Sequence, residues 1–415
     1  MTEESLNVAR KPSWLVFSQW REALLRREIL SICLFIFVTD MILGSMRPIL
    51  SLFATSLGAS LTLVGTLSLV VGLTQLSSGV IIGTVSDRQG RKGVLMAGML
   101  FLGLTALLMA LTTNPYLLLP IQVLLGLGFV STITVGLAYT ADVVTDQNRS
   151  VTFGLVTTMM GLGYAVGSAI GGTVAEMGGY SATYSLAAVL AVIGFFIAWA
   201  RIPGRQSGHS LAAGKSGPLS QQMRAMIANP VILAVCIGGL LIQLMFGGVV
   251  VTFFPLYAYG LGISRAVIGS IFATRALAST LVRLPGGALT AKFSGPRILL
   301  AAMVLSMVVA LALPQFESAA ILGALLITEG VAYGLYFTIA QATIAGYADE
   351  ASRGTALGMY ATVTGVGESL LPFFLGIVAD AFGLYRVFYI VGVLIAIGAS
   401  LMARVAKPIS IKTGE

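Results

Sequence analysis

The chain has 415 residues, of which 57% are hydrophobic and only 10% are charged. Soluble domains usually carry about 25% charged residues, so this composition indicates that lipid is the main solvent of the fold. The net charge of +8 could suggest a nucleic-acid-binding protein. The basic residues are instead spread over short segments between apolar runs, so we expect no nucleic-acid partner.

Residue types that bind metals or act as nucleophiles are scarce. Cys33 and Cys236 each lie in an apolar run without metal-ligand spacing, and the single histidine, His209, lies in a polar connector. The sequence contains no complete Gly-x-x-x-x-Gly-Lys-Ser/Thr nucleotide loop, because Gly214-Lys215-Ser216 in the polar connector has His209 where the first glycine would stand. It also contains no recognisable pairing of a nucleophile with a base. We therefore expect no enzyme, no cofactor and no metal site.

Apolar runs of membrane-spanning length dominate the chain, since a spanning helix needs about 20 such residues. Twelve segments qualify: 29–54, 62–84, 93–112, 115–140, 151–175, 182–201, 229–259, 265–286, 297–314, 318–346, 355–379 and 385–404. The predicted fold is an all-α membrane protein with twelve transmembrane helices in two six-helix bundles.

The bundles are predicted at 29–201 and 229–404, joined by a polar cytoplasmic linker at 202–228. Residues 1–28 form a predicted cytoplasmic or interfacial segment, with an amphipathic stretch at 13–27, and 405–415 form a cytoplasmic tail. We expect no cleavable signal peptide, because the first apolar run is too long for one.

The two predicted bundles are internal repeats. A constant offset of 204 residues superposes glycines and charged residues of the first half on similar residues of the second. The matched pairs include Gly83 with Gly287, Arg149 with Arg353, Gly154 with Gly358, Gly172 with Gly376, and Glu176 with Asp380.

Basic residues predict the orientation of the chain in the membrane. With both termini inside, most of the 24 Lys and Arg residues face the cytoplasm, including Arg283 near the loop that follows the 265–286 segment. Only Arg265 and Arg386 fall outside, and Arg47 and Arg275 fall within the membrane. We expect a monomer in the plasma membrane, which in bacteria is the inner membrane.

One charged stretch separates the second and third apolar runs: Gly83-Thr-Val-Ser-Asp87-Arg88-Gln-Gly90-Arg91-Lys92. Its charges exclude it from hydrocarbon, which predicts a tight loop at a membrane face. The pattern Gly-x-x-x-Asp-Arg-x-Gly-Arg-Lys resembles the loop signature of the major facilitator superfamily of secondary transporters. The resemblance extends over about residues 29–404 and implies parallel duplicated halves around a central cavity.

The resemblance also implies a conformational latch formed by Gly83, Asp87, Arg88, Gly90, Arg91 and Asp142. Asp87 would cap the helix that starts near Gly354, and Arg91 would pair with Asp142. Both contacts would hold the two halves together and break when the cytoplasmic side opens.

The 151–175 segment contains closely spaced glycines, Gly163-x-x-x-Gly167-Ser168-x-x-Gly171-Gly172. Small residues at this spacing allow helices to approach closely. The pattern resembles a signature of drug/proton antiporters, with Ser168 in place of a proline, although general helix packing also explains it.

A second antiporter feature is missing. Such antiporters often carry Arg-x-x-Gln-Gly in the fourth helix, and the matching positions here include Gln122, Leu125 and Gly126 without the arginine. The resemblance therefore does not carry over the usual proton relay.

Five charged residues lie inside apolar runs: Asp40, Arg47, Arg275, Glu329 and Glu368. Such residues are costly in a membrane and usually functional. Because burial disfavours a charged carboxylate, the three acids are candidates for proton coupling. Alternatively, Arg275 only neutralises Glu329 or Glu368 as a packing pair. Asp40 and Arg47 lie about 10.5 Å apart along one helix, which does not favour a direct contact.

Aromatic and amide side chains on the predicted cavity helices are candidates for substrate binding, together with Arg47 and Arg275. They are Phe253, Tyr257, Tyr333, Tyr336, Gln243 and Gln341. For about half of the aromatic residues, packing in the core is the alternative. Pro48, Pro255 and Pro372 are expected to bend their helices.

The favoured hypothesis is a proton-coupled transporter that exports a drug-like or small organic molecule by alternating access. Its partners would be that substrate, protons and the lipid bilayer. One alternative is an uptake symporter in which Arg47 and Arg275 bind a small organic anion or a sugar. Another is a membrane receptor or scaffold that transports nothing.

Overall fold

The computed structural model describes residues 26–144, 148–204, 228–289, 293–348 and 352–406. These residues form helices and contain no β-strand. The expected interfacial stretch at 13–27, the linker at 202–228 and the tail at 405–415 lie almost entirely outside the described residues.

The N-terminal half consists of six helices that cross the apolar layer within the described residues. They are α2 (Arg27–Ser56), α3 (Leu61–Gln89), α4 (Arg91–Leu111), the continuous run α5 (Leu118–Phe129), η4 (Val130–Thr134) and α6 (Val135–Val143), and the two parts of α7 (Arg149–Arg201). A short 3₁₀ turn, η3 (Pro115–Leu117), precedes α5. Gly179 divides α7 into two helices because its φ of 76° breaks the helical backbone.

The C-terminal half repeats this arrangement in the described residues. Its helices are the run α9 (Pro230–Gln243), η5 (Leu244–Phe253) and α10 (Phe254–Gly260), then α11 (Arg265–Leu289), α12 (Gly295–Ala312) with η6 (Leu313–Gln315), α13 (Ala319–Tyr347), the run α14 (Arg353–Gly365), η7 (Val366–Leu370) and α15 (Leu371–Phe382), and α16 (Leu384–Ala406). Eleven helical stretches have the length and hydropathy of a membrane span, and the stretch at Val151–Arg201 contains two of the twelve crossings.

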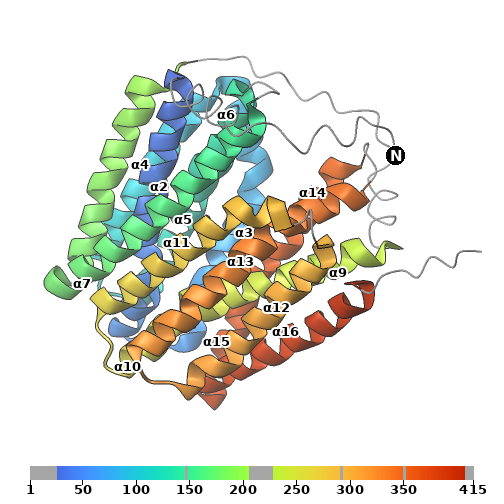
Figure 1. The fold of residues 1–415 in the computed structure, drawn as a ribbon. Helices are drawn as coiled ribbons and strands as arrows, with labels where there is room; N and C mark the ends of the chain where they lie inside the picture. Colours follow the sequence, from blue (N-terminus) through green and yellow to red (C-terminus); the bar gives the residue numbers. More distant parts are fainter. Residues whose placement is uncertain (1–25, 145–147, 205–227, 290–292, 349–351, 407–415) are drawn as a thin grey trace, which may run out of the picture.

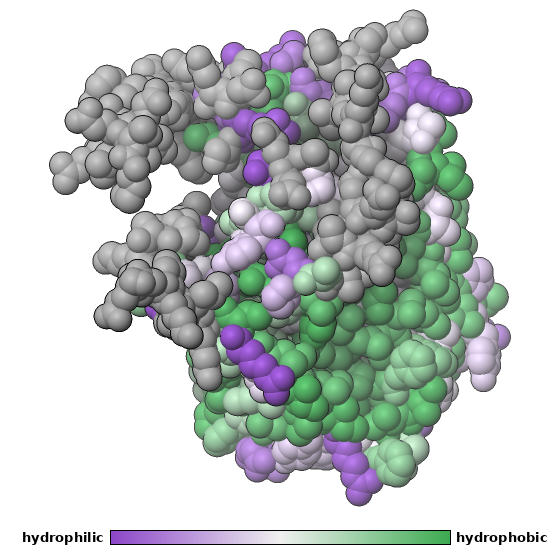
Figure 2. Space-filling model, turned by 90° about the vertical axis from the view of Figure 1, so that its right-hand side faces the viewer, coloured by the Kyte–Doolittle hydropathy of each residue, from purple (hydrophilic) through white to green (hydrophobic). Residues whose placement is uncertain are grey.

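The two halves form neighbouring bundles, coloured blue to green and yellow to red in Figure 1. A broad apolar band covers much of the face in Figure 2, with polar residues toward the ends. Leu107, Phe196 and Val393 are among the exposed large side chains of the chain. Such extensive apolar exposure fits a surface that contacts lipid rather than water.

Three of the runs are interrupted by wider, π-helical turns at η4, η5 and η7. The expected bends at Pro255 and Pro372 correspond to the turns after η5 and η7, because each proline stands at the start of the following α-helix. Proline lacks the N–H that a regular helix would use there. Pro48, in contrast, lies inside the unbroken helix α2.

The two ends of the molecule differ in how the halves pack. We call the end near Gln89, Val143 and Tyr347 the linker end, and the end with the 57–60 and 261–264 connections the loop end. At the loop end, α7 packs on α11 and α3 packs on α15.

Glycines make both loop-end contacts possible. A Cβ atom on Gly172 would come within 2.8 Å of the Cα of Gly269, and one on Gly65 within 3.0 Å of the Cα of Phe373. Near the linker end, a Cβ on Gly79 or Gly365 would meet no atom within 4 Å. The halves are therefore tightly packed at the loop end and separated between α3 and α14 toward the linker end.

Candidate functional site

Two cavities lie between the halves. The larger one, which we call the open cavity, occupies about 370 Å³ in the linker-end half. Its walls come from both bundles: Gly72, Gln75, Leu76, Gly79, Phe129, Val130, Thr134, Gln243, Ala361, Thr362, Thr364, Gly365, Glu368 and Ser369.

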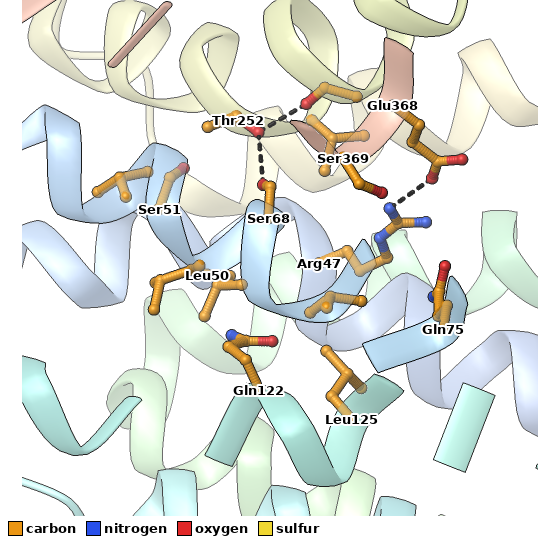
Figure 3. Close-up of a pocket in the computed structure, with 15 residues that line it drawn as sticks. Arg47, Leu50, Ser51, Ser68, Gln75, Gln122, Leu125, Thr252, Glu368 and Ser369 are labelled. Atoms are coloured by element: carbon orange, nitrogen blue, oxygen red, sulfur yellow. Dashed lines mark hydrogen bonds and ion pairs between the residues drawn. The ribbon is translucent and has the colours of Figure 1, made fainter. Parts of the chain in front are cut away.

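The smaller cavity, which we call the enclosed cavity, occupies about 50 Å³ in the loop-end half (Figure 3). It is lined by Arg47, Leu50, Ser51, Val64, Leu67, Ser68, Val71, Gln75, Gln122, Leu125, Gly247, Val251, Thr252, Glu368 and Ser369. Gln75, Glu368 and Ser369 line both cavities and so stand at the boundary between them.

An ion pair between the halves occupies this boundary. Arg47 on α2 donates from Nη2 to Oε1 of Glu368 on η7 over 2.8 Å. The amide of Gln243 lies 3.4 Å from the other carboxylate oxygen, Oε2. Both charged side chains keep about a quarter of their surface exposed. This contact joins two of the five charged residues that the apolar runs contain.

A second ion pair lies wholly inside the C-terminal half. Nε of Arg275 on α11 donates to Oε2 of Glu329 on α13, and both side chains are almost completely buried. The guanidinium also lies over the rings of Phe246 and Tyr333, 4.5 and 5.1 Å from their centroids. Of the two acids that Arg275 could neutralise, it contacts Glu329, while Glu368 pairs with Arg47.

Asp40 differs from the other two membrane acids. Its side chain is buried on α2, and Oδ2 has no hydrogen-bond partner among the described residues. Asp40 makes no ion pair with Arg47, as the distance along the helix predicts, and Arg47 pairs with Glu368 instead. A buried carboxylate without a partner is costly when ionised, and a proton removes that cost.

Arg283 lies within α11 rather than in the loop that follows it, and its guanidinium packs inside the molecule. Its assignment to the cytoplasmic side stays a prediction. The guanidinium is 4.9 Å from the centroid of Phe337, and Nη2 is 3.3 Å from Oγ of Ser279. Its Nε is buried without a partner among the described residues. The spacing Arg275, Ser279, Arg283 could have shown that all three share one helix face.

The aromatic candidates divide into two groups. Tyr333 stacks on Phe337 and packs on Phe246, next to the Arg275–Glu329 pair. Phe253, Tyr257 and Tyr336 instead belong to the core of the C-terminal bundle.

The placement of the second group has a simple reason. Tyr257 donates its hydroxyl to the carbonyl of Phe316, and Tyr336 donates to that of Val235, so both hydroxyls are satisfied inside the bundle. The amide candidates also separate, because Gln243 contacts Glu368 whereas Gln341 is exposed on α13. Tyr333 and Gln243 therefore lie beside the charged pairs, whereas Phe253, Tyr257, Tyr336 and Gln341 lie away from them.

The charged stretch at 83–92 is mostly helical rather than a tight loop. Gly83, Asp87 and Arg88 belong to the last turns of α3, and only Gly90, with φ 97°, separates α3 from α4. Gly90 provides the positive φ that the abrupt change of direction requires.

Arg91 makes the expected contact with Asp142, with Nε and Oδ2 2.9 Å apart, and also pairs with Asp87. Both pairs belong to the N-terminal half, so they hold α3, α4 and α6 together rather than joining the halves. A Cβ on Gly354 would meet no atom within 4 Å, so the chain is not closely packed at this point near the start of α14. The cap of α14 by Asp87 stays a prediction for the conformation with a closed linker end.

The glycines of α7 provide close helix packing. Cβ atoms on Gly163, Gly167 and Gly171 would collide with the backbone of α2, at Phe37, Met41 and Ser45 respectively. Gly172 faces α11 instead. The motif thus places α2, which carries Asp40 and Arg47, directly against α7.

Sequence reasoning missed two contacts that close the loop end. Asp380 accepts hydrogen bonds from the N–H groups of Leu61 and Thr62, at 3.0 and 2.8 Å, at the start of α3. Glu176 accepts from the N–H of Arg265, at 2.9 Å, at the start of α11. The 204-residue offset superposes both acids and both helix starts, so the repeat itself could have indicated these caps.

Comparison with known proteins agrees with this architecture. The sequence model of the Major Facilitator Superfamily matches residues 31–264 and 235–413. The chain therefore belongs to the major facilitator superfamily, a family of membrane transporters.

Individual relatives are distant. An uncharacterized MFS-type transporter of Methanocaldococcus jannaschii is 20% identical over 372 residues, which cover 88% of this chain and 94% of the relative. The multidrug resistance protein MdtG of Yersinia enterocolitica is 24% identical over 374 residues, covering 88% and 89%.

Solved structures show the same fold. A bacterial homologue of the human lysosomal transporter Spinster, in an inward-facing and unoccupied conformation, aligns with a TM-score of 0.77 at 14% identity, covering 91% of this chain and 96% of that one. The nucleoside transporter NupG aligns with a TM-score of 0.72 at 16% identity, covering 91% of this chain and 99% of that one.

Proposed function

We propose that this protein is a proton-coupled secondary transporter that exports a drug-like or small organic molecule from the cytoplasm by alternating access. Arg47 and Glu368, an ion pair between the halves, carry this proposal. A rocking motion that separates the halves at the loop end would have to break or rearrange this contact, and protonation of Glu368 would weaken it.

Asp40 supports the coupling to protons. Its buried carboxylate has no hydrogen-bond partner at Oδ2 among the described residues. A proton can neutralise Asp40 in this state, and a change in its surroundings would release that proton. Export is supported by the open cavity at the linker end, which the positive-inside rule assigns to the cytoplasm, and by the multidrug relatives.

The test uses purified protein in proteoliposomes, with ethidium as a fluorescent cationic probe and an imposed pH gradient. We expect pH-driven ethidium transport by the wild-type protein and its loss in Asp40→Asn and Glu368→Gln. Glu317→Gln, at an exposed acid in the loop-end connection, is the matched control and should transport normally. Unchanged pH-driven flux in Asp40→Asn, Glu329→Gln and Glu368→Gln would refute the coupling.

A second candidate function is the transport of an organic anion. The buried, unpaired Nε of Arg283 and its stacking on Phe337 favour a substrate with a carboxylate and an aromatic ring. Counterflow of labelled benzoate in the same vesicles tests it. Benzoate exchange that disappears in Arg283→Gln, with no ethidium transport by the wild type, would favour this alternative.

A further inference from the structure

The enclosed cavity suggests a route for the proton. We propose that this cavity is a hydrated compartment on the loop-end side of the Arg47–Glu368 pair, and that Glu368 passes protons between it and the open cavity. This inference rests on the proposed proton coupling, and it identifies one acid and one path among the candidates.

The wall of the enclosed cavity contains buried polar atoms that lack a protein partner among the described residues. Gln122 is completely buried, and both its Oε1 and its Nε2 are without a hydrogen-bond partner among the described residues. The Oγ atom of Ser51 is likewise unpartnered. Buried polar groups of this kind are destabilising unless a partner such as water satisfies them. Figure 3 shows Ser51 and Gln122 on the same side of the site as Ser68 and Leu50.

The size of the enclosed cavity and the polar groups in its wall fit water molecules. A buried water needs about 10–15 Å³ of room and two to four polar partners. The enclosed cavity offers about 50 Å³, enough for a short file of water molecules. Gln122 can donate and accept, and hydroxyls of Ser51, Ser68 and Thr252 line the same space. The rest of the wall is apolar apart from the charged and polar side chains of Arg47, Gln75, Glu368 and Ser369. A space of this size admits water but not an organic substrate.

Glu368 lies between the enclosed cavity and the open cavity. It lines both cavities, so its carboxylate is in reach of either one. The titratable and charged groups near it are Arg47 on α2, Tyr164 on α7 and Tyr333 on α13, and the neutral amide of Gln243 on α9 lies beside it. Arg47 is therefore the charge that a proton on Glu368 would release.

The loop end determines when the compartment can fill from outside. In this conformation, the carboxylate of Asp380 binds the start of α3, whose residues Val64, Leu67 and Ser68 form part of the cavity wall. Separation of α3 from α15 would open this wall. The proposed exchange with the outer solution therefore belongs to the conformation in which the loop end is open.

A hydronium ion in the compartment gives its proton to Oε1 of Glu368 and remains as water. The neutral carboxylic acid no longer holds Arg47, which keeps its own proton and its charge. When Glu368 faces the open cavity, it returns the proton to water there, and the ion pair with Arg47 forms again.

The decisive experiment measures Glu368 directly. Infrared difference spectra of the full-length protein between pH 5 and pH 9, in H₂O and D₂O, should contain a carboxyl band that Glu368→Gln removes. We expect Gln122→Leu, and Ser51→Leu as a second cavity-filling variant, to keep that band but to slow the pH-driven proton flux through the protein in proteoliposomes by about tenfold, which corresponds to about 1.4 kcal/mol in the barrier. The flux is the readout because exchange at Glu368 alone can also occur through the open cavity. Ser306→Ala is the control, because it removes a buried, unpartnered hydroxyl on α12, outside the cavity.

The outcomes separate this inference from the proposed function. A proton flux at the wild-type rate in both cavity variants would overturn the hydrated compartment, as would a spectrum in which Glu368 never becomes protonated. A slow proton flux in these variants, together with ethidium transport by the wild type that ignores the pH gradient, would support the compartment and refute proton-coupled export.

Discussion

The charged residues in the membrane segments are of two kinds, those in a direct ion pair and those without one, and the cost of removing the charge differs between them. Glu329 and Arg275 form a buried pair, so removing one charge leaves the other uncompensated. Breaking such a pair typically costs about 3–5 kcal/mol, whereas replacing both partners by apolar residues is often neutral. Asp40 makes no direct ion pair among the described residues, and Arg47 and Arg283 act on it only at longer range, so its neutralisation breaks no charge contact.

This contrast gives a stability prediction. We expect Glu329→Gln to lower the melting temperature of the detergent-purified protein strongly, and Arg275→Met combined with Glu329→Leu to restore most of the loss. Asp40→Asn, the matched single neutralisation, should leave the melting temperature unchanged or raise it. Equal melting temperatures for Glu329→Gln and wild type would show that the buried pair does not stabilise the C-terminal half.

The sequence identifies these charged residues but not their partners. A charge within an apolar run is conspicuous, which is why Asp40, Arg47 and Glu368 can be selected without a structure. Arg47 and Glu368 are 321 residues apart, and their contact depends on how two helices are rotated about their axes. The inward packing of Arg283 against Phe337 likewise depends on helix rotation, which the apolar runs do not specify.

At the scale of helices, two equivalent caps close the loop end. Each places a carboxylate from the end of one helix, Glu176 or Asp380, on the free N–H groups that begin a helix of the other half. A carboxylate in this position is stabilised by the unpaired N–H groups and by the helix dipole. The caps are made between the halves, so they favour the conformation described here over one with an open loop end.

Removing the caps should shift the conformational equilibrium. Each cap is worth about 0.5–2 kcal/mol, so the double variant Glu176→Ala/Asp380→Ala should raise the population with an open loop end by about tenfold or more. The measurement is a spin-label distance between Thr113→Cys and Ser318→Cys, in a background without Cys33 and Cys236.

A matched variant tests whether the position of the charge matters. Glu317→Ala removes an acid from the same end of the molecule, but no described hydrogen bond or ion pair joins it to a helix start. We expect its distance distribution to match that of the wild type. A distribution unchanged in the double cap variant would show that the glycine contacts alone close the loop end.

The helices themselves are largely predictable, because runs of apolar residues set their number and approximate bounds. The π-helical turns η4, η5 and η7 are not, since no apolar period distinguishes them from α-helix. Such turns change the faces to which the residues in and after them point, and Phe253 at the end of η5 and Tyr257 after it both lie in the bundle core. The charged stretch at 83–92 likewise reads as a loop from its charges, although its backbone is helical up to Gly90.

At the scale of the whole molecule, the duplicated halves are packed at one end and apart at the other. The repeat and the two-bundle architecture can be predicted from the 204-residue offset, but the conformation cannot. The same sequence must form at least two arrangements to transport by alternating access, so local patterns favour neither one. The contacts of Gly65, Gly172 and Gly269 show which end is closed in this state.

Closure of the linker end would require α3 and α14 to approach as α3 and α15 do at the loop end. Gly79 and Gly365 line the open cavity from opposite halves, and a side chain on either has free space in this conformation. A bulky residue there would fit the state described here and collide with the opposite half on closure. We therefore expect Gly365→Trp to hold the protein with its linker end open.

Transport and distance measurements test this arrest together. Gly365→Trp should keep the wild-type melting temperature and lose at least about 90% of ethidium transport. It should also show one long distance between labels at Gln89→Cys and Arg404→Cys, because the bulky indole ring fills space that α3 must occupy on closure. Gly346→Trp, at an exposed glycine of α13 outside the cavity, is the control and should transport normally. Normal transport by Gly365→Trp would mean that α3 and α14 never meet in the cycle, and that closure of the linker end occurs between other helices.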